Sequence, residues 1–543
     1  MQRIILILLL CLFCYTIKAQ IGTDKIPYSW RESRGTAMTQ LLPTVTFPPL
    51  DLKAINKEDL ENEKLGSLFR FGFPHNVNLT LSNSGIWQTT SDGGRLWKLK
   101  IYSPSALSLN LLYDKFYLPN GGEFFIYSED MKQHMGAFTS ENNKGDRKNI
   151  LGFATGLLFT NSIVLEYYEP ENCRDSGIIS ISQVISGYRD IREIEENRNQ
   201  SKSGSTGYFC HNDINCIEGL DYRKEKDAIA CIVQGIHACS GALLNTTAND
   251  FRPVFLTAGH CLSPYVTPDQ WVFYWNYEAS SCSGMTSLSS TKSTTGANIL
   301  ALNDATDFML LNLIENPIKN PNVFVYYLGW DRTTVSATSG VCIHHPNGVQ
   351  KKISITDKEI NSHPSSIYWT NGFSPVDSHW EVNFTNGTTE SSSSGAPLLN
   401  QNKRVIGQLH GGSSGCPPYV VKFYGRFDLS WEGGGTSSTR LKDWLDPLNT
   451  EVETLDGIEG CPTVNFHNDT INTTQTVTGG NVNVQDITVT NGATLTIKAE
   501  CDINVQGVTV QNNSKLILDA AGEVNIISDF EVESGSEFEI VYP

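Results

Sequence analysis

The order of apolar and polar residues predicts a chain built mainly from β-strands. Residues 97–101 (WKLKI) alternate with a period of two, which is typical of a half-buried strand. Similar runs at 107–112 and 123–127 flank a turn, and many more follow between residues 207 and 456. Within that last stretch we expect one helix, at 440–445, because Ser and Thr residues that can cap it precede it and a proline follows it.

The last 80 or so residues repeat with a spacing of about 21 residues. The segment 486–497 (DITVTNGATLTI) is echoed twice, by residues 507–518 and 529–540. Each copy holds two alternating strands around a small polar turn, which predicts a β-solenoid-like domain over 462–543 whose turns bury their faces by stacking. A small β-sandwich is the alternative. Cys461 and Cys501 are placed to staple this domain.

The N-terminus has the pattern of a secretory signal peptide. An apolar run over residues 4–15 follows Arg3 and is too short to span a bilayer comfortably. We expect a signal peptide over 1–19, cut ahead of Gln20, and no transmembrane segment after its removal; an uncleaved anchor is the alternative. The mature protein is then expected to be secreted, either extracellular or attached to the outer cell surface.

Composition shifts suggest the remaining domain boundaries. Residues 20–60 are Pro-rich and then charged, which suggests an extended lead-in. At 192–206 a charged stretch gives way to Ser and Gly, which is typical of a flexible linker and a proteolytic cut site. We therefore expect a segment over 20–204 that is β-rich from about residue 65, and a further domain over 205–456.

Charge and cysteine content narrow the function classes. The 40 basic and 58 acidic residues give a net charge of −18, which argues against a general nucleic-acid binder. Two of the 13 cysteines lie in the apolar N-terminal run, and most of the other eleven should pair in an exported chain. Because eleven is odd, at least one is free or pairs elsewhere, and the isolated Cys173 is the candidate.

Three segments carry residues suited to nucleophilic catalysis. An apolar strand (VFLTA) leads to His260, which suits a general base held at a surface. Asp307 stands at the start of another apolar strand (FMLLNL), where a carboxylate can orient an imidazole. Ser394 lies in a turn of small residues, where adjacent backbone N–H groups can face an oxyanion. The chain order His, Asp, Ser is that of trypsin-like proteases and predicts a catalytic triad that works through an acyl-enzyme.

Residues 207–456 resemble the lysyl endopeptidase family of secreted trypsin-like serine proteases. The matching segments are TAGHC (257–261), WNY (275–277), GWDR (329–332), HHPN (344–347), SSGAP (393–397), QLHGG (408–412), YGR (424–426) and WLDP (444–447). The resemblance implies a trypsin-like double β-barrel and a serine endopeptidase that acts on protein or peptide substrates.

The family also carries a long N-terminal propeptide, which residues 20–204 resemble in size and position. We therefore expect a zymogen whose own propeptide folds first and inhibits it. A catalytically silent binding or adhesion protein on a protease fold is the alternative. We expect a monomer with no cofactor and no metal site. His344 and His345 are expected to be structural, since adjacent residues on a strand point in opposite directions.

The resemblance further implies three disulfides and two supporting residues. The disulfides are Cys210–Cys416, Cys216–Cys282 and Cys239–Cys261. Cys231 and Cys342 have no counterparts in the family, and a fourth bridge between them is possible. Trp369 and His410 match positions that shield and orient the Asp–His pair, with ordinary core packing as the alternative.

Two departures from the family pattern concern specificity and the oxyanion hole. Lys422 stands where the family places an Asp that pairs with a substrate lysine, whereas the second pocket acid is kept in the pair Thr389 and Glu390. An unpaired Lys422 in the pocket favours acidic side chains, a pair with Glu390 leaves a neutral pocket, and a solvent-facing Lys422 leaves Glu390 to receive Lys or Arg. We lean to the second outcome, because a buried charge without a partner is costly.

Ser392 replaces a family glycine whose N–H forms the oxyanion hole together with that of Ser394. Glycine adopts unusual backbone angles at low cost, so a serine there is expected to bear about 1 kcal/mol of strain.

Overall fold

The computed structural model describes residues 25–32, 42–64, 68–189, 210–282, 292–320, 323–369, 372–417, 420–461, 463–499, 501–520 and 523–541. The expected signal peptide (1–19) and the whole of the expected linker and cut region (192–206) lie outside the described residues. No helix among the described residues is long and apolar enough to cross a membrane.

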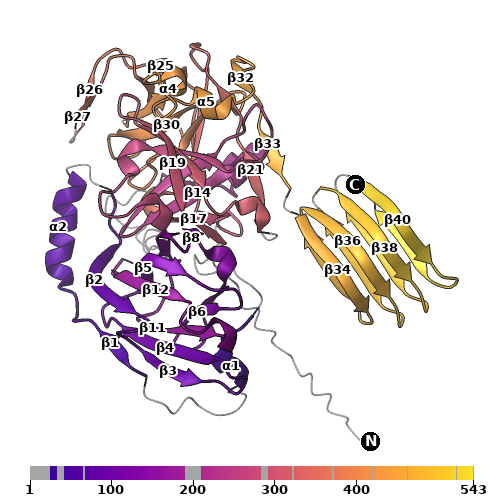
Figure 1. Cartoon of the computed structure of the whole chain (residues 1–543). Helices are drawn as coiled ribbons and strands as arrows, with labels where there is room; N and C mark the ends of the chain where they lie inside the picture. Colours follow the sequence, from indigo (N-terminus) through magenta and orange to yellow (C-terminus); the bar gives the residue numbers. More distant parts are fainter. Residues whose placement is uncertain are drawn as a thin grey trace, which may run out of the picture.

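The N-terminal part folds as two packed β-sheets (Figure 1). One contains β1 (Thr44–Thr46), β4 (Arg95–Tyr102), β11 (Ser162–Glu169), β6 (Glu123–Ser128) and β7 (His134–Phe138), with β3 (Ile86–Thr89) beside β4. The other contains β10 (Phe153–Ala154), β5 (Ser108–Tyr117), β12 (Ile178–Gly187) and β2 (Gly72–Thr80). Apolar side chains such as Trp97, Tyr113 and Phe124 fill a common core. Strand β4 is therefore more deeply buried than its alternating sequence predicts, with only Arg95, Lys100 and Tyr102 partly exposed.

The expected extended lead-in is wrong for part of its length. Residues Leu52–Lys64 form helix α2, and the backbone N–H of Ala54 donates to Asp51 Oδ1 at 3.0 Å at its start. Arg70 and Arg189 pair with the Asp59 carboxylate and so fix the helix to the strands that follow. A short helix α1 (Tyr28–Glu32) precedes it.

The middle part contains two mainly antiparallel sheets, in keeping with the double β-barrel that the resemblance implies. The first is seven-stranded, in the order β18 (Ser293–Thr295), β17 (Val272–Trp275), β14 (Ile229–Gln234), β15 (His237–Leu243), β16 (Val254–Ala258), β20 (Phe308–Leu313) and β19 (Ala297–Asn303). The second is ten-stranded. Its main path runs through β13 (Asn212–Asp213), β24 (Lys352–Thr356), β23 (Gly340–His344), β29 (Pro397–Asn400), β30 (Val405–Gly412), β31 (Lys422–Arg426), β28 (His379–Val382) and β25 (Asn361–Ser362).

Smaller elements complete this part. Strands β22 (Trp330–Asp331) and β32 (Thr454–Leu455) extend the ten-stranded sheet, and β26 (Ile367–Trp369) with β27 (Gly372–Ser374) forms a separate hairpin. The expected helix at 440–445 is present as α5 (Lys442–Leu445), but α4 (Phe427–Glu432) was not expected.

The N-terminal part and the seven-stranded sheet of the middle part share one hydrophobic core. Phe69, Phe71 and Ile185 belong to the same buried cluster as Val233 and Trp271. Polar contacts cross the same boundary: the Phe71 N–H donates to the Ile236 carbonyl at 3.0 Å, the Leu157 N–H to Tyr274 Oη at 2.7 Å, the Gly152 N–H to Asp269 Oδ2 at 2.6 Å, and Gln270 Nε2 to the Tyr113 carbonyl at 2.8 Å. Such a continuous apolar contact is typical of a stable interface rather than of a loosely tethered segment.

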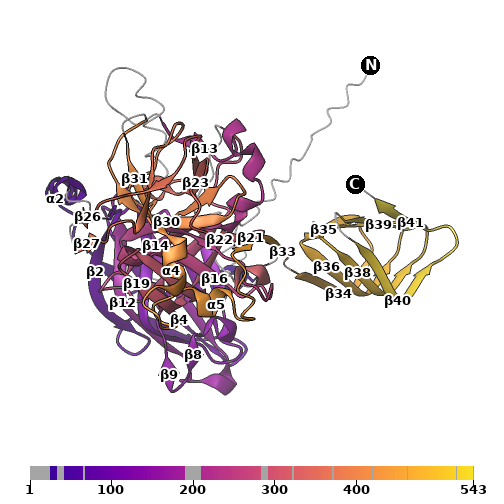
Figure 2. The ribbon, with the colours of Figure 1, turned by 90° about the horizontal axis from the view of Figure 1, so that it is seen from above.

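The C-terminal part is a β-solenoid of about 4 turns, as the repeat predicts, and not a sandwich of antiparallel sheets. Its two parallel sheets are β34 (Thr463–Ile471), β36 (Asn481–Val489), β38 (Ile503–Val510) and β40 (Val524–Val532), and β35 (Gln475–Gly479), β37 (Thr494–Ala499), β39 (Lys515–Ala520) and β41 (Glu537–Val541). In Figures 1 and 2 it stands to one side of the rest of the protein, after β33 (Ile458–Gly460). An asparagine ladder runs along one face, where the side chains of Asn465, Asn483, Asn504 and Asn525 bond in sequence at 2.9, 3.0 and 3.2 Å.

The disulfides follow the family pattern, with one correction. The three implied bridges form, and Cys461–Cys501 is a fourth. Cys173 is free, as expected. The suggested bridge between Cys231 and Cys342 is wrong: both thiols are free and buried, and they lie in different hydrophobic cores, one in each sheet of the double barrel. Burial raises the pKa of each thiol to about 12, so both are unreactive at neutral pH.

Candidate active site

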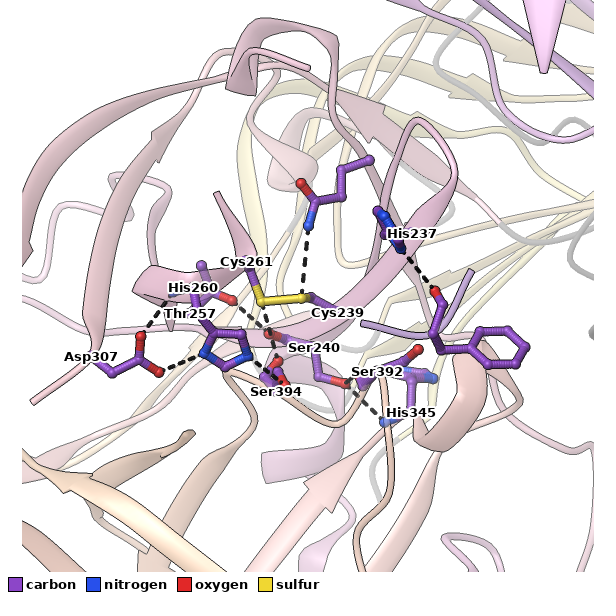
Figure 3. Close-up of a disulfide and its surroundings, with 12 residues drawn as sticks. His237, Cys239, Ser240, Thr257, His260, Cys261, Asp307, His345, Ser392 and Ser394 are labelled. Carbon is purple, nitrogen blue, oxygen red and sulfur yellow. Dashed lines mark hydrogen bonds and ion pairs between the residues drawn. A yellow bond between two sulfur atoms is a disulfide. The ribbon is translucent and has the colours of Figure 1, made fainter. Parts of the chain in front are cut away.

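His260 is held at the end of β16 by a short turn and a disulfide. The strand ends at Ala258, and the turn Gly259–Cys261 carries the imidazole toward the gap between the two sheets. Cys261 is bonded to Cys239 of the neighbouring strand β15, which fastens the turn on its far side (Figure 3). The rigid strand and the cross-link together fix the position of the ring, as a general base requires.

Asp307 meets His260 through two hydrogen bonds. Its Oδ2 atom lies 2.7 Å from His260 Nδ1, and its Oδ1 atom accepts the His260 backbone N–H at 2.8 Å. The residue is buried just before β20 and adopts a left-handed backbone with φ of 56°. Its carbonyl accepts the Gly259 N–H at 2.7 Å, so backbone and side chain both clamp the histidine turn.

Ser394 completes a continuous chain of contacts, seen in Figure 3. Its Oγ atom lies 2.8 Å from His260 Nε2. Ser240 of β15 braces the serine turn twice, because its N–H donates to the Ser394 carbonyl and its Oγ donates to the Ser392 carbonyl, both at 2.8 Å. The structure therefore brings together all three residues that the sequence singled out for catalysis, although they are widely separated in the chain.

The electrostatic environment favours a basic imidazole at His260 beside an ionised carboxylate at Asp307. Burial lowers the pKa of His260, but the charge and hydrogen bond of Asp307 outweigh it, so that the pKa lies above its ordinary value. Burial raises the pKa of Asp307, and the attraction of His260 and His410 with several hydrogen bonds reverses the effect and lowers it. The pair can therefore accept a proton from Ser394 and stabilise the imidazolium that results.

Trp369 and His410 lie beside the triad, as the resemblance implies. The Trp369 ring stacks on His410 with centroids 3.7 Å apart, and His410 Nε2 lies 3.6 Å from Asp307 Oδ2. Burial, the largest influence, lowers the pKa of His410 to about 3, so this ring is neutral at neutral pH and leaves the Asp307 charge to His260. His410 thus lies between the Trp369 ring, on which it stacks, and the Asp307 carboxylate.

One further histidine, which the sequence analysis did not single out, lies next to His410. His379, the first residue of β28, is buried and places Nε2 3.0 Å from His410 Nδ1. Its own Nδ1 lies 2.8 Å from Ser378 Oγ. The only available signal was a histidine preceding a short apolar strand, which is common in purely structural positions.

Ser392 occupies the strained position expected of it. Its φ is 68°, in the left-handed region that favours glycine, and its side chain is buried. Among the described residues its hydroxyl has no hydrogen-bond partner. The backbone turn at Ser392 is thus adopted despite the cost of a Cβ atom and a buried polar group.

Lys422 points into the protein and not to solvent. It is 3% exposed, and its Nζ donates to the carbonyl oxygens of Thr389 at 2.7 Å and Ser413 at 2.6 Å. Glu390 directs its carboxylate elsewhere: Oε2 accepts from Asn347 Nδ2 at 2.7 Å and lies 3.3 Å from His211 Nε2. The expectation of an ion pair between Lys422 and Glu390 is therefore wrong, because the ammonium is held by backbone carbonyls.

The adjacent histidines His344 and His345 are structural, as expected. His344 lies 2.8 Å from Ser393 Oγ and 3.0 Å from Ser354 Oγ, so it braces the residue before the nucleophile. Burial lowers the pKa of both rings, to about 3 for His345. In the part of the chain that the structure describes, His260, Asp307 and His410 are the one group of possible metal-binding side chains close enough to share an ion, and they contact one another instead.

Comparison with known proteins agrees with this geometry. Residues 203–424 match the family model described as the lysyl endopeptidase C-terminal domain. A protein from Pseudomonas aeruginosa named lysyl endopeptidase is 29% identical over 284 residues, which cover 48% of this chain and 56% of that relative. The chain thus spans little more than half the length of the curated relative it matches.

Two solved structures show a distant likeness. The Rv3671c protease from Mycobacterium tuberculosis in its active form matches 37% of this chain and 76% of its own, with 14% identity and a TM-score of 0.27. The MamO protease domain from Magnetospirillum magneticum matches 38% of this chain and 96% of its own, with 12% identity and a TM-score of 0.27.

Proposed function

Because residues 203–424 belong to the lysyl endopeptidase family, we propose that this chain is a serine endopeptidase that hydrolyses peptide bonds in protein or peptide substrates. The observation that carries the proposal is the unbroken contact chain from Asp307 through His260 to Ser394, at 2.7 and 2.8 Å.

The proposed reaction has two halves. His260 Nε2 takes the hydroxyl proton as Ser394 Oγ attacks the substrate carbonyl, and Asp307 stabilises the imidazolium. The backbone N–H groups of Ser392 and Ser394 receive the developing oxyanion. The imidazolium then protonates the leaving amine, and water, activated by the same histidine, releases the acyl group from Ser394.

The proposal includes an altered specificity relative to the family. An ammonium buried at the position of the pocket Asp repels the lysine side chain that the family binds there. We therefore propose that the enzyme does not select lysine on the acyl side of the cleaved bond. The altered specificity concerns which side chain is bound and leaves the reaction at Ser394 unchanged.

We also propose that the N-terminal part acts as a propeptide and inhibitor in a secreted zymogen. It contacts the protease through a shared core and through Phe71, whose N–H bonds to Ile236 in the loop before β15. This loop lies three residues before Cys239, which is bonded to the His260 turn. In Figures 1 and 2, helix α2 also lies beside the β26–β27 hairpin that carries Trp369. The contact at the loop before β15 and a helix beside the hairpin are suited to restricting access until the chain is cut.

Hydrolysis of an unfolded protein substrate tests the proposal. We expect the processed chain to generate new N-termini, and Ser394→Ala to generate none. Activity of the uncut chain equal to that of the processed chain would refute the propeptide role. A processed, folded chain that binds substrate without cutting it would instead support a binding or adhesion protein on a protease fold.

A further inference from the structure

A buried ammonium joins the two segments that lead to the catalytic residues. Thr389 lies five positions before Ser394, and Ser413 three positions after His410. Lys422 pairs with Gly412 across β30 and β31, and its Nζ bonds to the carbonyl oxygens of Thr389 and Ser413. The positive charge is therefore fixed between these two segments.

The charge of Lys422 is only partly compensated. An ammonium has three N–H groups, and two of them here bond to neutral carbonyl oxygens. Within the described residues no carboxylate lies within ion-pair distance of its Nζ, and the Glu390 carboxylate acts on it only from farther away. Burial outweighs that attraction and lowers the pKa of Lys422 to about 8, as expected for a cation that lacks a contacting counterion.

A second polar group at the same place also lacks a partner. The Thr389 hydroxyl is buried and, in the described part of the chain, makes no hydrogen bond. A buried hydroxyl without a partner is costly, and a bound ligand that accepts its hydrogen bond removes that cost. The carbonyl oxygen of Thr389 already accepts from the Lys422 ammonium. The Thr389 hydroxyl and the third N–H of Lys422 are therefore two neighbouring hydrogen-bond donors without acceptors among the residues described.

These features match the chemistry of a carboxylate. Its two oxygens can accept from an ammonium and a hydroxyl at once, and its charge supplies the missing counterion. A neutral amide of the same shape offers one oxygen and no charge, and a lysine brings a second positive charge to a buried one.

We propose, on the basis of the serine endopeptidase function proposed above, that Lys422 selects substrates with an aspartate or glutamate side chain on the acyl side of the cleaved bond. Lys422 is thus a specificity-determining residue, and Thr389 is its partner in holding the substrate carboxylate. Glu390 orients the segment around it through Asn347 and does not receive substrate.

The test uses peptides identical except for that one residue, which is Glu, Gln, Asp, Asn, Ala or Lys. The concentration of active enzyme is first determined by titrating the processed chain with a fluorophosphonate, so that every rate is expressed per reactive Ser394. We expect kcat/KM for Glu to exceed that for Gln by at least about tenfold, because the site is built to pair with a charge. The Lys peptide should be the poorest substrate. Equal rates for Glu and Gln, or fastest cleavage after Lys or Ala, would overturn the inference.

A matched pair of variants locates the selectivity. Lys422→Met keeps the length of the side chain without its charge, and we expect the Glu-to-Gln ratio to fall to about one while fluorophosphonate labelling persists. Lys422→Arg keeps the charge, and we expect it to retain a preference for acidic residues. An unchanged ratio in Lys422→Met would overturn the role of Lys422. A processed wild-type chain that neither reacts with the fluorophosphonate nor cleaves any peptide would refute the endopeptidase function itself. An enzyme that is labelled but shows no acidic preference would refute only the role of Lys422.

Discussion

The Nε2 atom of His379 lies 3.0 Å from the Nδ1 atom of His410, whose Nε2 atom lies 3.6 Å from Asp307 Oδ2, so the line of contacts continues beyond Asp307. Burial lowers the pKa of His379 to about 4, so both rings are neutral at neutral pH and the bond between them has one direction. The Asp307 carboxylate favours the His410 tautomer with its proton on Nε2, so His379 donates to Nδ1. At the far end Ser378 Oγ lies near both Pro375 O and His379 Nδ1 and can donate to only one of them. His379 is thus a positioning residue that holds the His410 ring in the tautomer that Asp307 favours.

Removing this donor should slow the chemical step. We expect His379→Met to lower kcat about fivefold, the loss that corresponds to one neutral hydrogen bond of about 1 kcal/mol, with KM unchanged. His379→Gln places an amide N–H close to the position of Nε2 and should restore most of the rate. Steady-state kinetics on one peptide measures both. Equal rates for the Met and Gln variants would show that the residue only fills space.

The pH profile reports the influence of Asp307 on His260. Only neutral His260 accepts the serine proton, and its raised pKa means that activity is lost as pH falls through a value above about 6.5. Asp307→Asn removes the charge, so the acid limb of kcat/KM should move to lower pH while the plateau falls by about 10⁴-fold. A variant whose acid limb stays in place would show that Asp307 does not set the basicity of His260.

Ser392 provides a test of strain at the oxyanion turn. Ser392→Gly removes both the Cβ from a backbone with φ of 68° and the buried hydroxyl, whereas Ser392→Ala removes the hydroxyl alone. We expect the glycine variant to be more stable than the alanine variant by up to about 1 kcal/mol, with kcat/KM at least equal to that of the wild type. Thermal unfolding of the processed enzymes measures the difference. A less stable glycine variant would show that Ser392 carries no strain.

The acidic preference should weaken in alkaline solution. Because the pKa of Lys422 is about 8, its charge is present below that pH and is lost above it. The titratable groups that act on it are Glu390, Cys342 and His344, of which the thiol and the imidazole stay neutral across this range. The ratio of kcat/KM for Glu and Gln peptides, in which the triad's own pH dependence cancels, should fall as pH rises through 8. A constant ratio from pH 7 to 9.5 would contradict the role of Lys422.

Local patterns, taken together, predicted the three residues that the structure brings into contact. His260 and Asp307 stand at the ends of apolar strands and Ser394 lies in a turn of small residues; each pattern alone is common in structural positions, and their order along the chain distinguished the set. The solenoid could also be predicted from the sequence, because its stacked turns require similar residues at equivalent positions. Strand alternation showed the mainly β class, and the family resemblance supplied the double barrel and three disulfides.

The remaining features depend on contacts that no local pattern encodes. The direction of Lys422 is set by carbonyls 33 and 9 positions away. Cys231 and Cys342 stay unpaired because the two barrel sheets place them in separate cores. His379 acquires its place near the triad only when β28 pairs with β31. For α2 a local signal existed, since Asp51 caps it, but the neighbouring prolines suggested an extended chain.

The central claim is that Ser394 is a nucleophile activated by His260. The most direct measurement is mass spectrometry of the processed chain after reaction with a fluorophosphonate, followed by mapping of the modified peptide. We predict one adduct, on Ser394, that is lost in Ser394→Ala and forms far more slowly in His260→Ala. A folded, processed chain that remains unmodified, or that carries its adduct on another residue, would contradict this account.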